Sequence, residues 1–444
     1  MSKRLLIIQP SHYLSKENHT LLKTGMKPLV PLTLPYLAAL TPEGWDVTLV
    51  DEQIQDVDVY SKPKPDVVAI TTWTIHSIRA YDLADEFRRQ GVPVIMGGPH
   101  VWFDPQEAAR HCDAIGIGEG EPIWARMLED AVNGRLQKVY HAPQMRSLAG
   151  LPLPRWDMLD LRTYGPFKTY SLMSSRGCPM QCEFCSERLY LGGGYRVRPT
   201  AEVIEDIQHT GAKSIFFGDS DFGGKRARAM ELMEAMIPLK VRWSALWTSN
   251  LCSDAEYMDL AKRSGLLHLN IGIESINEET LKGMNKKFNK VNRYSELLDN
   301  LRKRGISYSL NFIFGWDNET PDVFRSTLNF LEQEKVPVAY FNILTPEKGT
   351  MFYERMKSED RILKLDEIGR WPGHTCYIKP RYCTPEEMVN NVQHIYREFY
   401  SWKSIVKRLP LPVTQANIAS WVLNLSQRKM AQLSDEENNN FDAF

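Results

Sequence analysis

The first part of the chain, to about residue 140, alternates short apolar runs with stretches whose apolar side chains recur at helical spacing. The runs that we interpret as strands lie at residues 4–9, 45–51, 67–71, 94–97 and 114–118. Between two of them, residues 78–90 place Ala80, Leu83, Ala84 and Phe87 on one helical face. Strands that alternate with helices predict a doubly wound α/β fold, a parallel sheet with helices on both faces. Ligands of such a fold bind in the crevice at the carboxyl ends of the strands.

A second alternating series begins at residue 171, after the proline-rich segment 151–156. Its strands are expected at residues 171–174, 214–217, 242–246, 268–273, 307–314 and 339–344, with helices at 201–209, 225–236, 254–264 and 291–304. Six βα-like units are too few for an eightfold barrel, so we predict a partial (β/α)6 barrel.

From Pro385 onward the pattern is helical, and the acidic, asparagine-rich tail 434–444 is expected to be disordered. The predicted organisation is therefore a doubly wound domain (residues 1–145), a linker (146–170), the partial barrel (171–350) and a mainly helical C-terminal cap (351–444).

Net charge and the distribution of apolar residues limit the partners and the cellular location that we expect for this protein. The 444 residues carry a formal net charge of -1, so no global electrostatic attraction to nucleic acid or to an anionic membrane is expected. The N-terminal apolar run is only four residues long, far shorter than a signal peptide or a membrane-spanning helix requires. These features favour a cytoplasmic protein.

Three of the seven cysteines lie within eight residues, in the order Cys178, Cys182 and Cys185. In a cytoplasmic chain this favours metal or redox chemistry over disulfides. A structural zinc site normally needs four protein ligands, and the next histidine downstream, His209, lies on a predicted helix. A [4Fe–4S] cluster held by three cysteines has one open iron, which can bind the amino and carboxylate groups of S-adenosylmethionine. We therefore favour a cluster over a zinc clip or a chance grouping.

With Phe184 before the last cysteine, this spacing resembles the signature of the radical S-adenosylmethionine (SAM) superfamily. Residues 218–222 resemble the polar element beside the SAM amino group, although Asp-Ser-Asp stands here in place of the Gly-Gly-Glu of many members. Residues 272–275 resemble the fourth-strand element near the ribose and carboxylate, and residues 314–320 the segment beside the adenine, with Asp317 in place of proline. The SAM contacts that the resemblance implies are Phe184, Gly218, Asp219, Asp221, Glu274, Ser275 and Gly315.

The strand ends of the first domain, together with residues 34–40, resemble the cobalamin-binding domain of B12-dependent radical SAM enzymes. The cobalamin contacts that this implies are Ser11, Asp51, Thr72, Trp73, His76, Gly97, Gly98, Pro99, His100, Gly118, Glu119 and Glu121. The glycines would let the nucleotide tail approach the backbone, and Glu119 and Glu121 could accept hydrogen bonds from a ribose or a corrin amide. The D-x-H-x-x-G pattern of another cobalamin class is absent, so Trp73 and His76 are the candidates to meet the lower face of the cobalt.

The resemblance implies a C-methyltransferase, which moves a methyl group from SAM through methylcobalamin to an unactivated carbon that the 5′-deoxyadenosyl radical has activated. The alternatives are an oxidative cyclisation or rearrangement with the same parts, or a radical enzyme whose first domain no longer binds cobalamin. The expected partners are a small-molecule substrate and an electron donor such as flavodoxin or ferredoxin. Candidate substrate contacts are Trp247, Asn270, Asn311, Tyr340 and Asn342 in the barrel, and Trp371, Pro372, Gly373, His374, Tyr377, Arg381 and Tyr382 in the cap.

Overall fold

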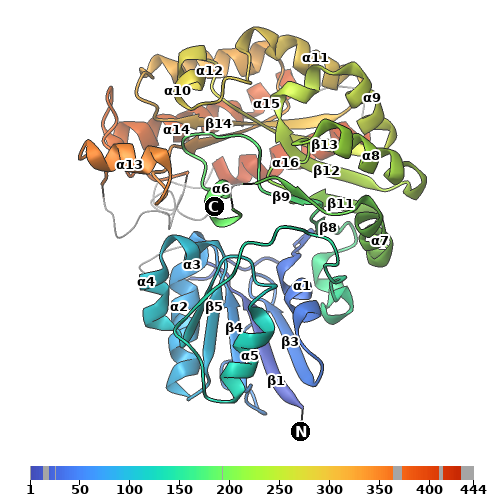
Figure 1. The fold of residues 1–444 in the computed structure, drawn as a ribbon. Coiled ribbons are helices and arrows are strands. Elements are labelled where there is room, and N and C mark those ends of the chain that lie inside the picture. Colours follow the sequence, from blue (N-terminus) through green and yellow to red (C-terminus); the bar gives the residue numbers. More distant parts are fainter. Residues whose placement is uncertain are drawn as a thin grey trace.

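The computed structural model describes residues 2–13, 20–25, 27–192, 194–363, 373–409 and 414–431. Two parallel sheets with their helices form two layers of the molecule, the N-terminal part below and the larger part above in Figure 1. The predicted fold class is confirmed. Of the predicted features, Trp371, Pro372 and the tail 434–444 lie outside the described residues.

The first sheet has six strands in the order β3-β1-β4-β5-β6-β7, and all neighbouring pairs are parallel. Its strands are β1 (Lys3–Gln9), β3 (Trp45–Asp51), β4 (Val67–Thr71), β5 (Val94–Gly97), β6 (Ala114–Ile117) and β7 (Val139–His141). The five expected strands are confirmed within a residue at either end. The edge strand β7 was missed, because three residues are too short a run to give a periodicity signal.

Both faces of this sheet are covered, as alternating side chains in β1 show. Leu5 and Ile7 belong to one apolar cluster and Leu6 and Ile8 to another, since successive side chains of a strand point to opposite faces. Helices α1 (Thr33–Leu40) and α5 (Trp124–Val132) cover the first face. Helices α2 (Ser77–Arg89), α3 (Pro99–Phe103) and α4 (Pro105–His111) cover the second.

The second sheet has seven parallel strands in the order β15-β14-β13-β12-β11-β8-β2. They are β8 (Thr169–Leu172), β11 (Ser214–Phe217), β12 (Arg242–Thr248), β13 (Leu266–Glu274), β14 (Ser307–Phe314), β15 (Val338–Ile343) and the short β2 (Leu29–Val30). Six of these were expected from the sequence. The seventh, β2, comes from the N-terminal segment and pairs with β8, so the chain enters both sheets before residue 31.

Helices cover the outer face of this sheet, which forms the open barrel above the first domain (Figure 1). They are α7 (Thr200–Thr210), α8 (Arg226–Met236), α9 (Ala255–Arg263), α10 (Glu278–Gly283), α11 (Tyr294–Lys303) and α12 (Asp322–Gln333). Leu269, Ile271 and Ile273 of β13 are buried against this outer layer, which leaves Asn270 on the inner face. Trp247 is also buried in the outer layer, where its Nε1 donates to Cys252 Sγ at 3.1 Å. Its prediction as a substrate contact is therefore wrong.

The C-terminal cap is helical, as expected, with α13 (Met351–Ser358), α14 (Pro385–Phe399), α15 (Trp402–Arg408) and α16 (Gln415–Ala431). Helix α16 contacts β13, β14 and β15. The Ser420 hydroxyl lies 2.9 Å from that of Ser307, which also bonds to His268, so α16 closes the amino end of the barrel's inner face. Among the described helices, none is both long and apolar enough to cross a membrane.

Candidate active site between the two sheets

The cysteine loop (residues 178–185) follows the short strand β9 (Ser175–Arg176), which continues from the end of β8. Gly177 begins the loop with φ +82°, and a Cβ at this position would lie 2.1 Å from the Gly194 carbonyl oxygen. Because no other residue fits this turn, Gly177 fixes the direction in which the loop leaves the barrel.

Hydrogen bonds from distant segments hold the loop in place. The Glu183 N–H donates to the Met284 carbonyl at 3.0 Å, and Asn285 Nδ2 donates to the Gln181 carbonyl at 2.7 Å. On the other side, the Phe352 N–H at the start of α13 donates to the Glu183 carbonyl at 3.1 Å. The end of α10 and the cap together therefore set the shape of the loop.

All three cysteines of the loop are half-buried free thiols. Burial raises the pKa of Cys178 to about 11 and that of Cys185 to about 12. In the part of the chain that the structure describes, no group of three His, Cys, Asp or Glu side chains is arranged to hold a single metal ion. A cubane iron–sulfur cluster needs thiols that are spaced apart, since each binds a different iron.

Asp219, expected to contact SAM, is instead bonded within the protein. Its carboxylate accepts hydrogen bonds from the Ser174 N–H at 2.7 Å, from the Ser174 hydroxyl, and from the Ser175 hydroxyl at 2.9 Å. Arg228 donates to the same Ser174 hydroxyl at 2.9 Å. Asp219 therefore holds the strand end that leads into the cysteine loop, and its bonding capacity is largely used.

Asp221, two residues later, has the opposite surroundings. Its side chain is buried, and among the described residues no side chain donates a hydrogen bond to either carboxylate oxygen. Burial raises its pKa to about 6, partly offset by the backbone N–H groups of Thr248 and Gly223. Cys178 and Lys286 are close enough to influence it electrostatically. A buried carboxylate without a side-chain partner beside the cysteine loop is suited to a cationic ligand group.

Glu274 is fixed by a partner that the sequence did not reveal. It sits at an irregularity where β13 meets β14, with φ +65°, and its Oε1 accepts from Lys286 Nζ at 2.5 Å. Although burial opposes it, Glu274 and the neighbouring Cys182 raise the pKa of Lys286. The ammonium keeps donors to spare, because one of its three N–H groups satisfies Glu274.

Glu319 organises the turn after β14. Its Oε2 accepts from the N–H groups of Gly315 at 2.9 Å and Trp316 at 3.1 Å, and Ser275 Oγ lies 3.4 Å from Oε1. Burial raises the pKa of Glu319 to about 7. Gly315 adopts φ +112°, which favours glycine. The predicted contacts Ser275 and Gly315 thus lie side by side at the ends of β13 and β14.

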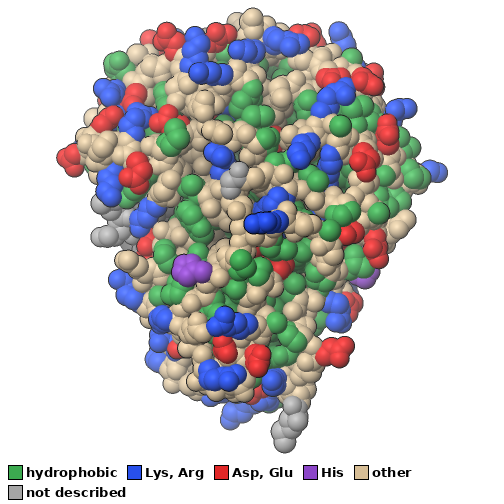
Figure 2. Space-filling model, in the orientation of Figure 1, with side chains coloured by type: hydrophobic (Ala, Val, Ile, Leu, Met, Phe, Trp, Pro, Cys, Tyr) green, Lys and Arg blue, Asp and Glu red, His purple; other side chains and the backbone are tan. Residues whose placement is uncertain are grey.

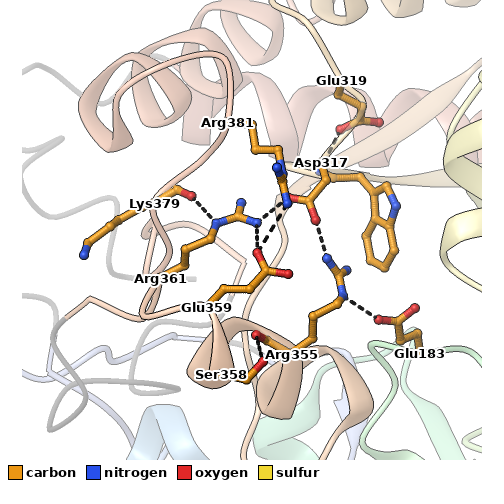
Figure 3. A network of polar contacts seen from close by, with 10 residues as sticks. Glu183, Asp317, Glu319, Arg355, Ser358, Glu359, Arg361, Lys379 and Arg381 are labelled. Atoms are coloured by element: carbon orange, nitrogen blue, oxygen red, sulfur yellow. Dashed lines mark hydrogen bonds and ion pairs between the residues drawn. The ribbon is translucent and has the colours of Figure 1, made fainter.

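Asp317, which stands where the family pattern has proline, is the centre of a charged cluster (Figure 3). Arg361 Nη1 lies 2.6 Å and Arg381 Nε 3.3 Å from its Oδ1, and Arg355 pairs with its other oxygen. Arg355 also donates to Glu183 of the cysteine loop at 3.0 Å. We call this group the Asp317 network; it ties the cap to the cysteine loop.

A cavity of about 310 Å³ lies on the first sheet between α1 and α5. The predicted cobalamin contacts that line it are Gly97, Gly98, Pro99, Gly118, Glu119 and Glu121. Gly98 has φ +103°, and a Cβ there would lie 2.7 Å from the Thr72 carbonyl oxygen, so glycine is required. The wall is completed by Arg176, Tyr190 and Leu191, which flank the cysteine loop in sequence. The cavity therefore reaches from the first domain to the cysteine loop.

Glu119 and Glu121 are bonded to the barrel rather than free for a ligand. Arg176 donates to Glu119 at 2.6 Å and to Glu121 at 2.5 Å, and Arg196 donates to the other oxygen of Glu119 at 2.6 Å. The Tyr36 hydroxyl donates to Glu121 at 2.7 Å. All four charged side chains are at most 12% exposed, so this Arg176 network is a buried connection between the domains.

The other predicted cobalamin contacts do not line this cavity. Four of them are hydrogen-bonded within the protein. Ser11 bonds to Glu52 and Leu22, and Asp51 bonds to Lys27 and Tyr164. The Thr72 hydroxyl donates to the Trp73 carbonyl, and His100 bonds to Tyr81. His76 is turned toward His12, with ring centroids 5.7 Å apart, and burial lowers its pKa to about 3. Trp73 is 51% exposed and meets Tyr190 edge-on at 6.3 Å, so it lies near the rim of the cavity.

The remaining substrate candidates lie on the barrel's inner face or in the cap. Asn311 Nδ2 donates to Asn270 Oδ1 at 2.6 Å, and Asn342 packs against Gly373, whose carbonyl accepts from the Ile343 N–H at 2.6 Å. Tyr340 shares this face and is part-buried. In the cap, burial lowers the pKa of His374 to about 4, Tyr377 is buried, Arg381 belongs to the Asp317 network and Tyr382 is 56% exposed.

Family models match both halves of the chain. The B12 binding domain matches residues 20–127, and the Radical SAM superfamily matches residues 172–331. Bacteriochlorophyllide d C-12(1)-methyltransferase of Chlorobaculum tepidum is 30% identical over 96% of this chain and 94% of its own. Hopanoid C-2 methylase of Rhodopseudomonas palustris is 24% identical over 82% of this chain and 72% of its own.

Solved structures show the same fold. The radical SAM methyltransferase TsrM from Kitasatospora setae, with tryptophan substrate and a SAM analogue bound, matches with a TM-score of 0.70 at 17% identity, covering 96% of this chain and 98% of its own. The cobalamin-dependent radical enzyme OxsB, with aqua-cobalamin and SAM bound, matches with a TM-score of 0.63 at 15% identity, covering 97% of this chain and 71% of its own. The chain is a radical SAM enzyme. It belongs to the cobalamin-dependent family of these enzymes.

The matched models and the site agree on the cofactors: a [4Fe–4S] cluster and SAM in the barrel, and cobalamin in the first domain. The structure fits each of them. The three thiols lie in one loop, the Asp221 carboxylate lacks a side-chain partner beside that loop, and the cavity lies over the glycine-rich strand ends of the part that matches the B12 binding domain. Arg176 and Lys286 were missed in the sequence because a single arginine or lysine carries no motif, and only the fold identifies its partners.

Proposed function

We propose that this protein is a cobalamin-dependent radical SAM methyltransferase that methylates an unactivated carbon of a small molecule. The observation that carries the proposal is the shared wall of the cavity. Strand-end residues of the first domain and Arg176, Tyr190 and Leu191 beside the cysteine loop line one space. A carbon that is to lose a hydrogen to one cofactor and gain a methyl group from another needs both within reach.

When bound, the cluster supplies the electron for SAM cleavage, cobalamin carries the methyl group, and SAM is the source of both the methyl group and the radical. The role of the chain is to bind, orient and exclude water. Asp221 would accept hydrogen bonds from the α-ammonium group of SAM, because its buried carboxylate has no side-chain partner. Lys286, held by Glu274, donates to the SAM carboxylate with its spare N–H groups.

Gly315 and Ser275 support the adenosine end of SAM at the ends of β14 and β13. Glu319 keeps that turn in shape through two backbone N–H groups. Asn270, Asn311 and Tyr340 present polar groups on the inner face, where we place the substrate. Relatives named for bacteriochlorophyllide d and for hopanoids both match, so the proposal stops at the class of reaction.

The second candidate, a cyclisation without methyl transfer, has support from one group of relatives. Anaerobic magnesium-protoporphyrin IX monomethyl ester cyclase of Cereibacter sphaeroides is 25% identical over 77% of this chain and 61% of its own. Methylation is favoured because the methyltransferase of Chlorobaculum tepidum matches over nearly the full length of both chains.

Product analysis of the anaerobically reconstituted enzyme separates the two candidates. Methylation predicts 5′-deoxyadenosine together with S-adenosylhomocysteine, and a substrate mass increase of about 14 units, which is the mass of the added CH₂. 5′-Deoxyadenosine without S-adenosylhomocysteine would contradict methyl transfer and favour cyclisation. Cys182→Ala should abolish cluster absorbance and 5′-deoxyadenosine, whereas the matched control Cys383→Ala, also a half-buried free thiol, should keep both.

A further inference from the structure

A basic segment (residues 282–290) begins in the last turn of α10 and lies against the cysteine loop. Lys282, Lys287 and Lys290 are exposed, and none of the three forms an ion pair within the described part of the chain. Lys286 differs from them, since it is buried and paired with Glu274. Glu278 and Glu279 are exposed in the first turn of α10, whereas the lysines begin in its last turn, so the positive charge is concentrated at the carboxyl end of that helix and in the residues after it.

Two hydrogen bonds join this segment to the cysteine loop. The Met284 carbonyl accepts from the Glu183 N–H at 3.0 Å, and Asn285 Nδ2 donates to the Gln181 carbonyl at 2.7 Å. Gln181 and Pro179 are the exposed residues of the loop, and Asn285 is exposed as well. The part of the cysteine loop that meets solvent therefore contacts the segment that carries the three exposed lysines.

This concentration of charge is local. The chain as a whole carries a formal net charge of -1. Figure 2 shows charged side chains of both signs spread over one face, with apolar and uncharged surface between them. General attraction of anions is therefore not expected, and the lysines act on whatever approaches the cysteine loop itself.

The radical chemistry proposed at the cysteine loop requires an external electron donor. Reductive cleavage of one SAM takes up one electron and breaks the sulfonium C–S bond, giving methionine and a 5′-deoxyadenosyl radical. The electron comes from a protein that is itself oxidised by one electron and must approach the loop from solvent. Electron-transfer encounters bury little surface, so complementary charge guides the approach and sets the orientation.

We propose that Lys282, Lys287 and Lys290, with Gln181 at the exposed tip of the cysteine loop, form the docking surface for a small acidic one-electron carrier protein. The inference rests on the proposed radical function and adds the place of electron entry. The surface lies on the barrel, and the cavity of the first domain has none of these four residues in its wall.

The test compares two lysine triplets in the reconstituted full-length enzyme. The docking variant is Lys282→Gln, Lys287→Gln and Lys290→Gln together. The matched control is Lys213→Gln, Lys240→Gln and Lys303→Gln, which removes the same charge from exposed lysines near the amino ends of β11, β12 and β14. Formation of 5′-deoxyadenosine is measured with reduced flavodoxin and, separately, with reduced methyl viologen, a small cation that the lysines do not attract.

With flavodoxin at low ionic strength, the docking variant should need about tenfold more donor for half-maximal rate, and its rate should depend less on salt. With methyl viologen both variants should match the parent enzyme. The proposal is overturned if flavodoxin drives the docking variant normally, if the control loses as much, or if methyl viologen is equally impaired. A parent enzyme that makes no 5′-deoxyadenosine even with methyl viologen would instead refute the proposed function.

Discussion

Two charged networks hold the cysteine loop, one through Arg176 and one through Glu183, and they differ in burial. The Arg176 network joins the loop's amino end to Glu119 and Glu121 of the first domain, with every member at most 12% exposed. The Asp317 network joins Glu183 inside the loop to the cap, and its arginines range from 11% to 52% exposed. The loop is thus fixed to the first domain by buried bonds and to the cap by bonds that water partly screens.

The difference bears on what each network can do. Removing one partner from a buried ion pair leaves an uncompensated charge, which is far more costly than losing an exposed pair. The position of the cysteine loop relative to the cavity is therefore more strongly determined than its position relative to the cap. The cap side is the part of the site that can change with less loss of stability, for instance as substrate enters.

The largest effect is expected for Arg176→Met, which removes the centre of the buried network. Glu119 would keep Arg196, and Glu121 would keep only Tyr36. Loss of one buried partner typically costs about 3–5 kcal/mol, so the urea unfolding midpoint should fall markedly and cobalamin titrated by absorbance should bind more weakly. Arg176→Lys, which keeps the charge, should have an unfolding midpoint between those of the parent and Arg176→Met. A midpoint close to that of the parent would show that the network is not a stabilising connection.

The second-largest effect is a pH dependence of the unfolding free energy that arises from Glu319, in the turn that carries Asp317. Burial raises the pKa of Glu319 to about 7, above its usual 4.5. The folded state then binds more protons than the unfolded state between these values, so stability declines as pH rises through that window. The unfolding free energy of the parent relative to Glu319→Gln should fall between pH 5 and pH 7, by up to about 3 kcal/mol, and then stay level. A difference that is constant with pH would contradict the buried carboxyl.

A smaller effect is expected for Arg355→Met in the Asp317 network. Asp317 would keep Arg361 and Arg381, so only Glu183 would lose its partner. Because these groups are partly exposed, the loss of unfolding free energy should be about 1–2 kcal/mol. Arg355→Lys serves as the control that retains charge. A loss as large as that of Arg176→Met would remove the contrast between the two networks.

The smallest effect is expected at a second link between the domains, the pair Lys348–Asp104, whose side chains are 34% and 25% exposed. An ion pair of this exposure contributes about 0–1 kcal/mol, so Lys348→Met should leave the unfolding midpoint and cobalamin binding almost unchanged. If it weakened both as Arg176→Met does, the position of the domains would depend on the number of links rather than on their burial.

Much of the architecture follows from the sequence, because local periodicity reports strands and helices directly. Five strands of the first sheet and six of the second lie close to their predicted positions. Strand β2 was missed because two residues have no periodicity, and its pairing with β8 is a contact across 140 positions of sequence, from Leu29 to Thr169. Trp247 was misassigned because a single strand does not reveal which of its faces is buried under helices.

The sequence by itself determined the cysteine spacing, the order of the strand-end motifs and hence the family, since these are local patterns. Only the tertiary structure decided which carboxylates are free to bind a ligand. Asp219 and Asp221 are two residues apart, yet Asp219 is bonded to Ser174 and Ser175 and Asp221 has no side-chain partner among the described residues. Glu119 and Glu121 line the cavity as predicted contacts would, yet only the fold shows that Arg176 is bonded to both of them. A hydrogen bond depends on a partner's position in space, which distant parts of the chain supply.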